Sequence, residues 1–170
     1  ILGSVREGRK SEAPAKYVHE KVLAAGHQSI LVDFKAMPLP FYNAPTVPVV
    51  YYKSKYPNDN AQKWSEIARA ADGFIIVTPE YNHGYPAVLK NAMDYVYQEW
   101  NNKPIAFIAY GSASGARSVE QLREVAVELQ MAPIRNAIHM PYDLILAMKG
   151  GKTAAEVCAP FAERVTGLAD

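Results

Sequence analysis

The segment at residues 73–78 (GFIIVT) constrains the fold most, because it is apolar almost throughout and contains no charged side chain. A strand with this pattern is typical of a sheet that is covered on both faces. Similar short runs occur at 29–34 (SILVDF) and 104–110 (PIAFIAY), and stretches with helical spacing separate them. Strands that alternate with helices in this way form right-handed βαβ units. The sequence therefore predicts an α/β protein with a parallel sheet between two layers of helices.

The order of the predicted elements follows from the same patterns. We expect strands at 1–2, 29–34, 73–78, 104–110 and 133–138, and helices at about 12–25, 59–72, 86–100, 116–130 and 153–168. Residues 35–58 carry five prolines and several tyrosines, so we expect a long irregular loop there. A strand beginning only at Ile1 is very short, so we also expect residues upstream of it. The pattern predicts one domain over residues 1–170 with five parallel strands.

Charge and composition exclude several classes of protein. Eighteen basic and 17 acidic residues leave a net charge of +1, which is not the basic balance of proteins that bind duplex nucleic acid or anionic membranes. No apolar run reaches the roughly 20 residues of a membrane helix. The single cysteine, Cys158, excludes an intrachain disulfide and a multi-thiolate metal site. We therefore expect a cytoplasmic protein that binds no metal, no nucleic acid and no membrane.

Ligands of parallel α/β sheets bind beyond the carboxyl ends of the strands, which directs attention to the loops at 3–11, 78–86 and 110–117. The first loop offers the hydroxyls of Ser4 and Ser11 and the guanidinium of Arg6, and Ser11 precedes a predicted helix that it can cap. A solvated turn with an ordinary serine cap is the alternative. Neither G-x-x-x-x-G-K-[ST] nor G-x-G-x-x-G is present, which favours a single terminal phosphate over a triphosphate or a dinucleotide.

The other two loops supply flat and polar groups. Tyr81 and Tyr85 in the second loop have faces that suit an aromatic ring, and Asn82 suits the polar edge of a heterocycle. The third loop has several small residues before a helix, a pattern typical of backbone N–H groups that stabilise an anion. It is not a hydrolase nucleophile elbow, because Ala113 stands where that motif needs serine.

Together the three loops resemble the NADPH-dependent FMN reductase family. The resemblance is carried by G-S-x-R…S at 3–11, T-P-E-Y-N…P-A-V-L-K-N-A-M-D at 78–94 and Y-G-S-A-S-G-A-R at 110–117, and it extends to about residue 130. It implies a flavodoxin-like three-layer sandwich that binds FMN and uses NAD(P)H as co-substrate. By position it implies that the FMN phosphate lies on Ser4, Arg6 and Ser11, the isoalloxazine ring beside Pro79, Glu80, Tyr81 and Asn82, and the pyrimidine end at Gly111, Ser112, Ser114 and Gly115, with Arg117 close by.

The activity implied by the resemblance is hydride transfer from NAD(P)H through FMN to a small acceptor such as free flavin, a quinone or an azo compound. This scheme needs no protein acid or base, so no catalytic residue is named. Two alternatives stay open: a flavodoxin-type electron carrier without NAD(P)H turnover, and a regulatory protein that has lost the cofactor. The tyrosines of loop 42–56 and the helix at 89–94 are expected at a subunit contact of a homodimer or homotetramer, against the alternative of a surface loop without a role.

Overall fold

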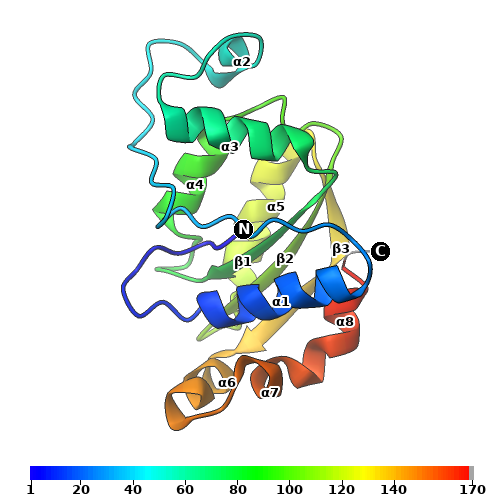
Figure 1. Ribbon diagram of the computed structural model, residues 1–170. Helices are drawn as coiled ribbons and strands as arrows, with labels where there is room; N and C mark the ends of the chain where they lie inside the picture. The colour runs from blue at the N-terminus through cyan, green and yellow to red at the C-terminus, as the bar shows by residue number, and fades with distance from the viewer. Residues whose placement is uncertain (169–170) are drawn as a thin grey trace.

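A parallel sheet between two layers of helices forms the centre of the protein (Figure 1), in a computed structural model that describes residues 1–168. The strands are β1 (Phe74–Pro79), β2 (Pro104–Gly111) and β3 (Ala132–Pro141), in the order β1-β2-β3. Both neighbouring pairs are parallel, with Ile76 opposite Phe107 and Ile108 opposite Ile138. Because all three strands point the same way, the loops that follow β1 and β2 leave the sheet at one edge.

The prediction of five strands is wrong as a count, since three strands are assigned among the described residues. The predicted strands at 1–2 and 29–34 are reduced to isolated parallel bridges, in which Leu2 pairs with Asp33 on one side and Val77 on the other. Leu2 N donates to Val32 O over 2.9 Å, and Gly3 N donates to Val77 O over 2.8 Å. The order in space is still 29–34, 1–3, β1, β2, β3.

Two hydrophobic cores pack against the two faces of the sheet. One lies under α3 (Asp59–Ala70), α4 (Ala87–Asp94) and α5 (Ala116–Glu128). The other lies under α1 (Glu12–Ala24), α6 (Tyr142–Ala147), α7 (Ala154–Cys158) and α8 (Ala162–Thr166). Successive residues of β1 alternate between them, so that Ile76 belongs to the first core and Val77 to the second. This confirms the sequence pattern of strands buried on both faces.

Several helix boundaries differ from the predicted ones. The helix expected to reach residue 100 ends at Asp94, and Trp100 instead turns inward, where its indole N–H donates to Met93 O over 3.3 Å. The helix expected at 153–168 is divided into α7, the 3₁₀ turn η2 (Ala159–Phe161) and α8, because Pro160 has no N–H to continue the helical ladder. Short helices that were not predicted are α2 (Pro48–Tyr51), α6 and the 3₁₀ turn η1 (Met148–Gly150).

The tyrosines of the 42–56 loop are less exposed than their number suggested. Tyr56 is buried, and its hydroxyl donates to Glu99 Oε1 over 2.7 Å. Tyr42 packs edge-on against Tyr95, with ring centroids 5.1 Å apart. The large hydrophobic side chains exposed in this loop are Val47, Val49 and Val50, and Phe41 directly before it is exposed as well.

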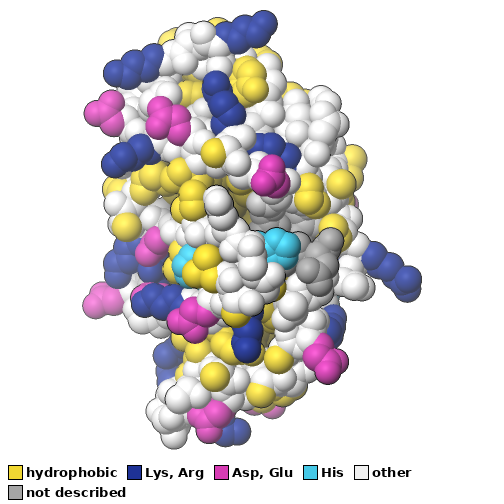
Figure 2. All heavy atoms as spheres, turned by 45° about the vertical axis from the view of Figure 1, so that its right-hand side comes forward, with side chains coloured by type: hydrophobic (Ala, Val, Ile, Leu, Met, Phe, Trp, Pro, Cys, Tyr) yellow, Lys and Arg dark blue, Asp and Glu magenta, His cyan; other side chains and the backbone are white. Residues whose placement is uncertain are grey.

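The surface seen in Figure 2 carries positive and negative side chains interspersed with apolar ones. No large region of a single sign is visible on that face, so it does not steer a charged partner from a distance. Within residues 1–168, no helix combines the length and apolar character that a bilayer crossing requires.

Candidate functional site

Three loops meet at the carboxyl edge of the sheet, and polar contacts connect them. Ser4 Oγ in the first loop lies 2.8 Å from the Tyr81 hydroxyl in the second. Arg117, which follows the third loop, donates its backbone N–H to Glu80 Oε2 over 3.2 Å. The structure therefore brings into one region the three segments that the sequence selected.

The first loop ends at a hydroxyl that is buried without a partner. Ser11 is the residue before α1, but its φ of −68° and ψ of −21° are helical and its side chain makes no capping bond. The expected cap is therefore absent, because a capping residue needs an extended backbone to turn its oxygen toward the free N–H groups. Ser11 Oγ is buried and has no hydrogen-bond partner among residues 1–168. It leaves the N-terminus of a 13-residue helix open to an anion.

Tyr110, which sequence reasoning did not select, reaches the same loop from the end of β2. Its side chain is buried, and burial raises the pKa of the phenol to about 12, while the neighbouring Ser11 hydroxyl and, to a smaller extent, the charge of Arg6 oppose the rise. The phenol therefore stays protonated at neutral pH and adds a neutral hydroxyl beside Ser11. Its position at the carboxyl end of a predicted strand was the one sequence feature that pointed to the site. That feature is weak, because many apolar strands end in a tyrosine.

The two arginines of the first loop have different environments. Arg6 is exposed, and no ion pair with another described residue involves it. The side chain of Arg9 is largely shielded from solvent and pairs with both carboxylate oxygens of Asp33, with N–O distances of 2.7 and 2.5 Å. The Arg9 guanidinium holds the pKa of Asp33 below its usual range. Because that pKa is lowered on folding, the pair stabilises the protein above about pH 4, the normal range of an aspartate, and the contribution is lost as the pH falls further.

The second loop is a tight two-residue turn. Tyr81 and Gly84 exchange both backbone hydrogen bonds, at 2.8 and 3.0 Å. Asn82 and His83 between them have φ values of 48° and 69°, the left-handed pair of a type I′ turn. Both side chains are exposed at its tip. The turn keeps the ring of Tyr81 partly exposed while its hydroxyl reaches back to Ser4.

Glu80 and Arg117 form an ion pair across the second and third loops, Oε1 to Nη2. The Glu80 side chain is 4% exposed and that of Arg117 33%, and Arg117 Nη1 also lies 2.7 Å from His83 Nε2. Both residues were expected beside the flavin, yet here their charges neutralise each other and connect the loops. Sequence reasoning also missed Ser118, whose buried hydroxyl donates to Gly84 O over 2.8 Å.

The third loop turns sharply before α5. Ser114 and Gly115 have φ values of 53° and 72°, and Ser114 N donates to Gly111 O over 2.8 Å. A side chain at Gly115 would lie 2.6 Å from Tyr110 N, so only glycine fits between this turn and the strand. Ser112 is exposed on the outside of the loop. Such a turn presents backbone N–H groups toward one side, as an anion-binding nest does.

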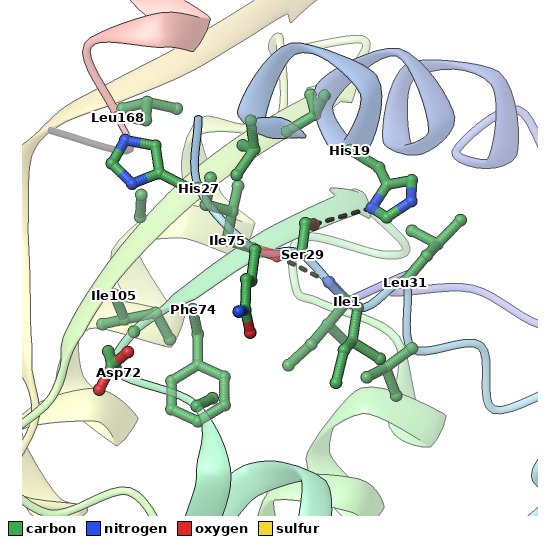
Figure 3. Close-up of a pocket in the computed structure, with 18 of the residues that line it drawn as sticks. Ile1, His19, His27, Ser29, Leu31, Asp72, Phe74, Ile75, Ile105 and Leu168 are labelled. Atoms are coloured by element: carbon green, nitrogen blue, oxygen red, sulfur yellow. Dashed lines mark hydrogen bonds between the residues drawn. The ribbon is translucent and has the colours of Figure 1, made fainter. Parts of the chain in front are cut away.

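A separate cavity of about 650 Å³ lies at the opposite edge of the sheet (Figure 3). Its walls are mainly apolar side chains beside Ile1, Phe74 and Ile75. The ring nitrogen Nδ1 of His19 on one side is paired with Ser29 Oγ at 2.8 Å. The cavity is at the amino ends of the strands, away from the edge where ligands of such sheets bind, and we assign no cofactor to it.

Metal and thiol chemistry find no support in the described part of the chain. No group of three or more His, Cys, Asp or Glu residues between 1 and 168 is arranged to hold a metal ion. Cys158 is a free and buried cysteine, and burial raises the pKa of its thiol to about 11. Its reactive thiolate is therefore scarce at neutral pH.

Comparisons with known proteins point in one direction. The family described as NADPH-dependent FMN reductase matches residues 1–143. An NAD(P)H-dependent FMN reductase of Schizosaccharomyces pombe is 36% identical over 149 residues, which cover 86% of this chain and 74% of that protein. A quinone reductase of Escherichia coli K12 is 32% identical over 135 residues, covering 76% and 68%.

Among solved structures, FerB, a flavoenzyme NAD(P)H:(acceptor) oxidoreductase from Paracoccus denitrificans, superposes with a TM-score of 0.74. The superposition covers 99% of this chain and 92% of that one at 22% sequence identity. At this identity the likeness establishes the fold, which is α/β and flavodoxin-like.

Proposed function

The chain belongs to the NADPH-dependent FMN reductase family, and from that premise we propose that its three carboxyl-edge loops hold FMN and expose it to NAD(P)H and to a small acceptor. The protein is an FMN-dependent oxidoreductase with NAD(P)H as co-substrate. This family favours an enzyme over an electron carrier of the flavodoxin type. Our proposal concerns which residues contact FMN and which small molecule accepts the electrons.

The observation that carries the proposal is the buried hydroxyl of Ser11 at the start of α1, which leaves the helix uncapped and makes no hydrogen bond of ordinary geometry within residues 1–168. A phosphate placed there accepts from that hydroxyl and from the first N–H groups of the helix, whose dipole also favours an anion. The exposed guanidinium of Arg6 adds a planar pair of donors that matches phosphate oxygens. The residues present therefore fit the phosphate of FMN.

The second and third loops fit the ring of the cofactor. FMN supplies the ability to accept a hydride from NAD(P)H and to pass electrons on to the acceptor. Tyr81 offers apolar surface and Asn82 stands at the tip of the turn, whereas Pro79, which was expected beside the ring, is buried at the end of β1. The N–H groups of the Gly111–Gly115 segment, apart from that of Ser114, which donates to Gly111 O, are placed to donate to negative charge at the polar edge of the ring. Because Glu80 and Arg117 neutralise each other, we assign that stabilisation to the backbone of the third loop, with Ser112 and Ser114 at its outer side.

Replacement of Arg6 by alanine should raise the dissociation constant for FMN about tenfold or more, as expected for the loss of a charged hydrogen-bonding partner. Titration of the apoprotein with FMN, followed by flavin fluorescence, measures this. Riboflavin lacks the phosphate, so its affinity should be the same in the parent and the variant. An unchanged FMN affinity would remove Arg6 from the site.

A turnover survey tests the acceptor. The purified, FMN-loaded protein should oxidise NADH or NADPH in the presence of a quinone, free flavin or an azo dye, and a quinone reductase relative makes the quinone the first choice. The same survey with both nicotinamide donors determines which of them is preferred. Absence of turnover with every acceptor and both donors would contradict the proposed function.

We also propose that two copies associate through the outer side of the 41–50 loop and α4. Phe41 is 78% exposed and Val50 53% exposed, and Phe41 lines an open groove of about 580 Å³ together with α4. Exposed apolar side chains in and beside such a groove are typical of a protein interface. A cytoplasmic location and a single domain over 1–170 stay predictions from the sequence.

Substitution of Val50 by glutamate should convert the oligomer to a monomer, because association would bury the new charge in an apolar contact. Sedimentation velocity measures the change. The control is Leu23→Glu on α1, 46% exposed and on the other side of the sheet, which should leave the mass unchanged. A parent protein that is monomeric at every concentration would refute the proposal.

A further inference from the structure

We propose that Arg9 is a positioning residue for the cofactor phosphate: its guanidinium holds the 3–11 loop in shape from behind and does not itself contact the phosphate. The inference rests on the proposed location of the FMN phosphate at this loop. It assigns to Arg9 a role opposite to that of Arg6, although both are arginines of one short loop.

All five N–H groups of the Arg9 guanidinium already have acceptors. Nη1 donates to Ser4 O at 3.0 Å and to Asp33 Oδ1 at 2.7 Å. Nη2 donates to Asp33 Oδ2 at 2.5 Å and to Glu12 Oε2 at 3.2 Å, and Nε donates to Glu12 Oε2 at 3.4 Å. An arginine has no further donor, so contact with a phosphate would break one of these bonds. The side chain is also only 6% exposed.

The acceptors of Arg9 lie in three segments whose relative positions determine the shape of the proposed phosphate site. Ser4 O lies in the loop itself, and the neighbouring Ser4 Oγ accepts from Arg6 N at 3.3 Å. Glu12 is the first residue of α1, next to Ser11. Asp33 is the bridge partner of Leu2 at the side of the sheet. One side chain therefore connects the loop, the start of the helix and the sheet.

The charges around Arg9 support a geometric role. Asp33 and Glu12 both pair with it, so the cluster as a whole does not attract an anion. Glu12 also pairs with Lys16, at 2.8 Å on the exposed side of α1. A direct contact and a positioning role then predict opposite effects for Asp33→Asn. If charge alone matters, removal of the negative charge of Asp33 should increase the affinity for FMN. If the shape of the loop matters, loss of the bidentate Arg9–Asp33 pair should decrease that affinity.

The experiment measures dissociation constants of the apoprotein for FMN and for riboflavin. It compares Arg9→Met, Arg9→Lys and Asp33→Asn with Lys16→Met, the matched control that removes the other cation paired with Glu12. We expect the FMN constant to rise about tenfold in Arg9→Met, since a charged hydrogen-bond network is lost. It should rise less in Arg9→Lys, which keeps the charge but not the planar fork. It should also rise in Asp33→Asn and stay unchanged in Lys16→Met.

Loop positioning predicts that riboflavin affinity stays within about twofold of the parent in all four variants. A tighter FMN complex in Asp33→Asn would overturn the inference in favour of direct attraction. An unchanged FMN constant in Arg9→Met and Arg9→Lys, together with weaker binding in Arg6→Ala, would also overturn it while keeping the proposed site. An unchanged constant in Arg6→Ala as well would refute both. The Asp33→Asn and Arg9→Lys variants keep the test valid if Arg9→Met does not fold.

Discussion

Replacement of Gly115 by alanine should abolish retention of FMN and lower the free energy of unfolding by about 3 kcal/mol, from left-handed strain and overpacking together. Gly115 has a φ of 72°, and its added Cβ would lie 2.5 Å from Ala109 Cβ and 2.6 Å from Tyr110 N. These atoms belong to β2 in the centre of the sheet, so the loop and not the strand must move. Urea unfolding gives the stability, and flavin released on gel filtration reports on retention.

Gly8→Ala is the control for that experiment. Gly8 also has a positive φ, 63°, but nothing lies within 4 Å of its added Cβ. The cost should therefore be only the strain of the left-handed backbone, about 1 kcal/mol. Equal losses in the two variants would show that the close approach of the third loop to β2 has no energetic weight.

Replacement of Arg117 by methionine has the second largest expected effect. It leaves the buried carboxylate of Glu80 without its guanidinium partner, and breaking a buried pair on one side costs about 3 kcal/mol when neither group is exposed. Because Arg117 is 33% exposed, water compensates in part, and we expect about 2 kcal/mol. The second and third loops should also separate, so that riboflavin and FMN both bind more weakly.

Urea unfolding and a riboflavin titration test this prediction. Glu80→Gln should cost less than Arg117→Met, because a neutral amide is cheaper to leave buried than a carboxylate. Lys90→Met is the control: Lys90 and Asp94 form an exposed pair at 2.7 Å, and its loss should cost less than about 1 kcal/mol. If Arg117→Met weakened FMN but not riboflavin, the pair would act on the phosphate end and the assignment of these loops to the ring would be wrong.

The sequence was sufficient to predict the α/β class, the parallel sheet and the edge at which the loops gather. These features depend on local patterns, such as the uncharged run of β1 and the helix that follows each strand. The number of strands was predicted less well, because it depends on hydrogen bonding between segments that are far apart in the sequence. The 29–34 segment has strand composition, but the structure pairs it with Leu2 through an isolated bridge and assigns no ladder there.

The site was predictable in its segments and less so in the roles of its residues. Arg6 and Arg9 look alike in sequence, and only the position of Asp33, 24 residues away from Arg9, distinguishes them. Ser11 has the residue type of a helix cap, but its backbone conformation prevents capping. Glu80 and Arg117 lie in two different motifs, and a sequence pattern gives no information that they face each other.

The packing of the two cores has a spectroscopic consequence. The sequence has two tryptophans, Trp64 and Trp100, and both lie in the core under α3, α4 and α5, with ring centroids 5.4 Å apart. Their emission therefore senses the environment of that layer directly and the layer of α1, α6, α7 and α8 only through the sheet. A fluorescence melting curve should coincide with one from far-ultraviolet circular dichroism when both layers unfold together, and it should lag behind when the α1 layer loosens first.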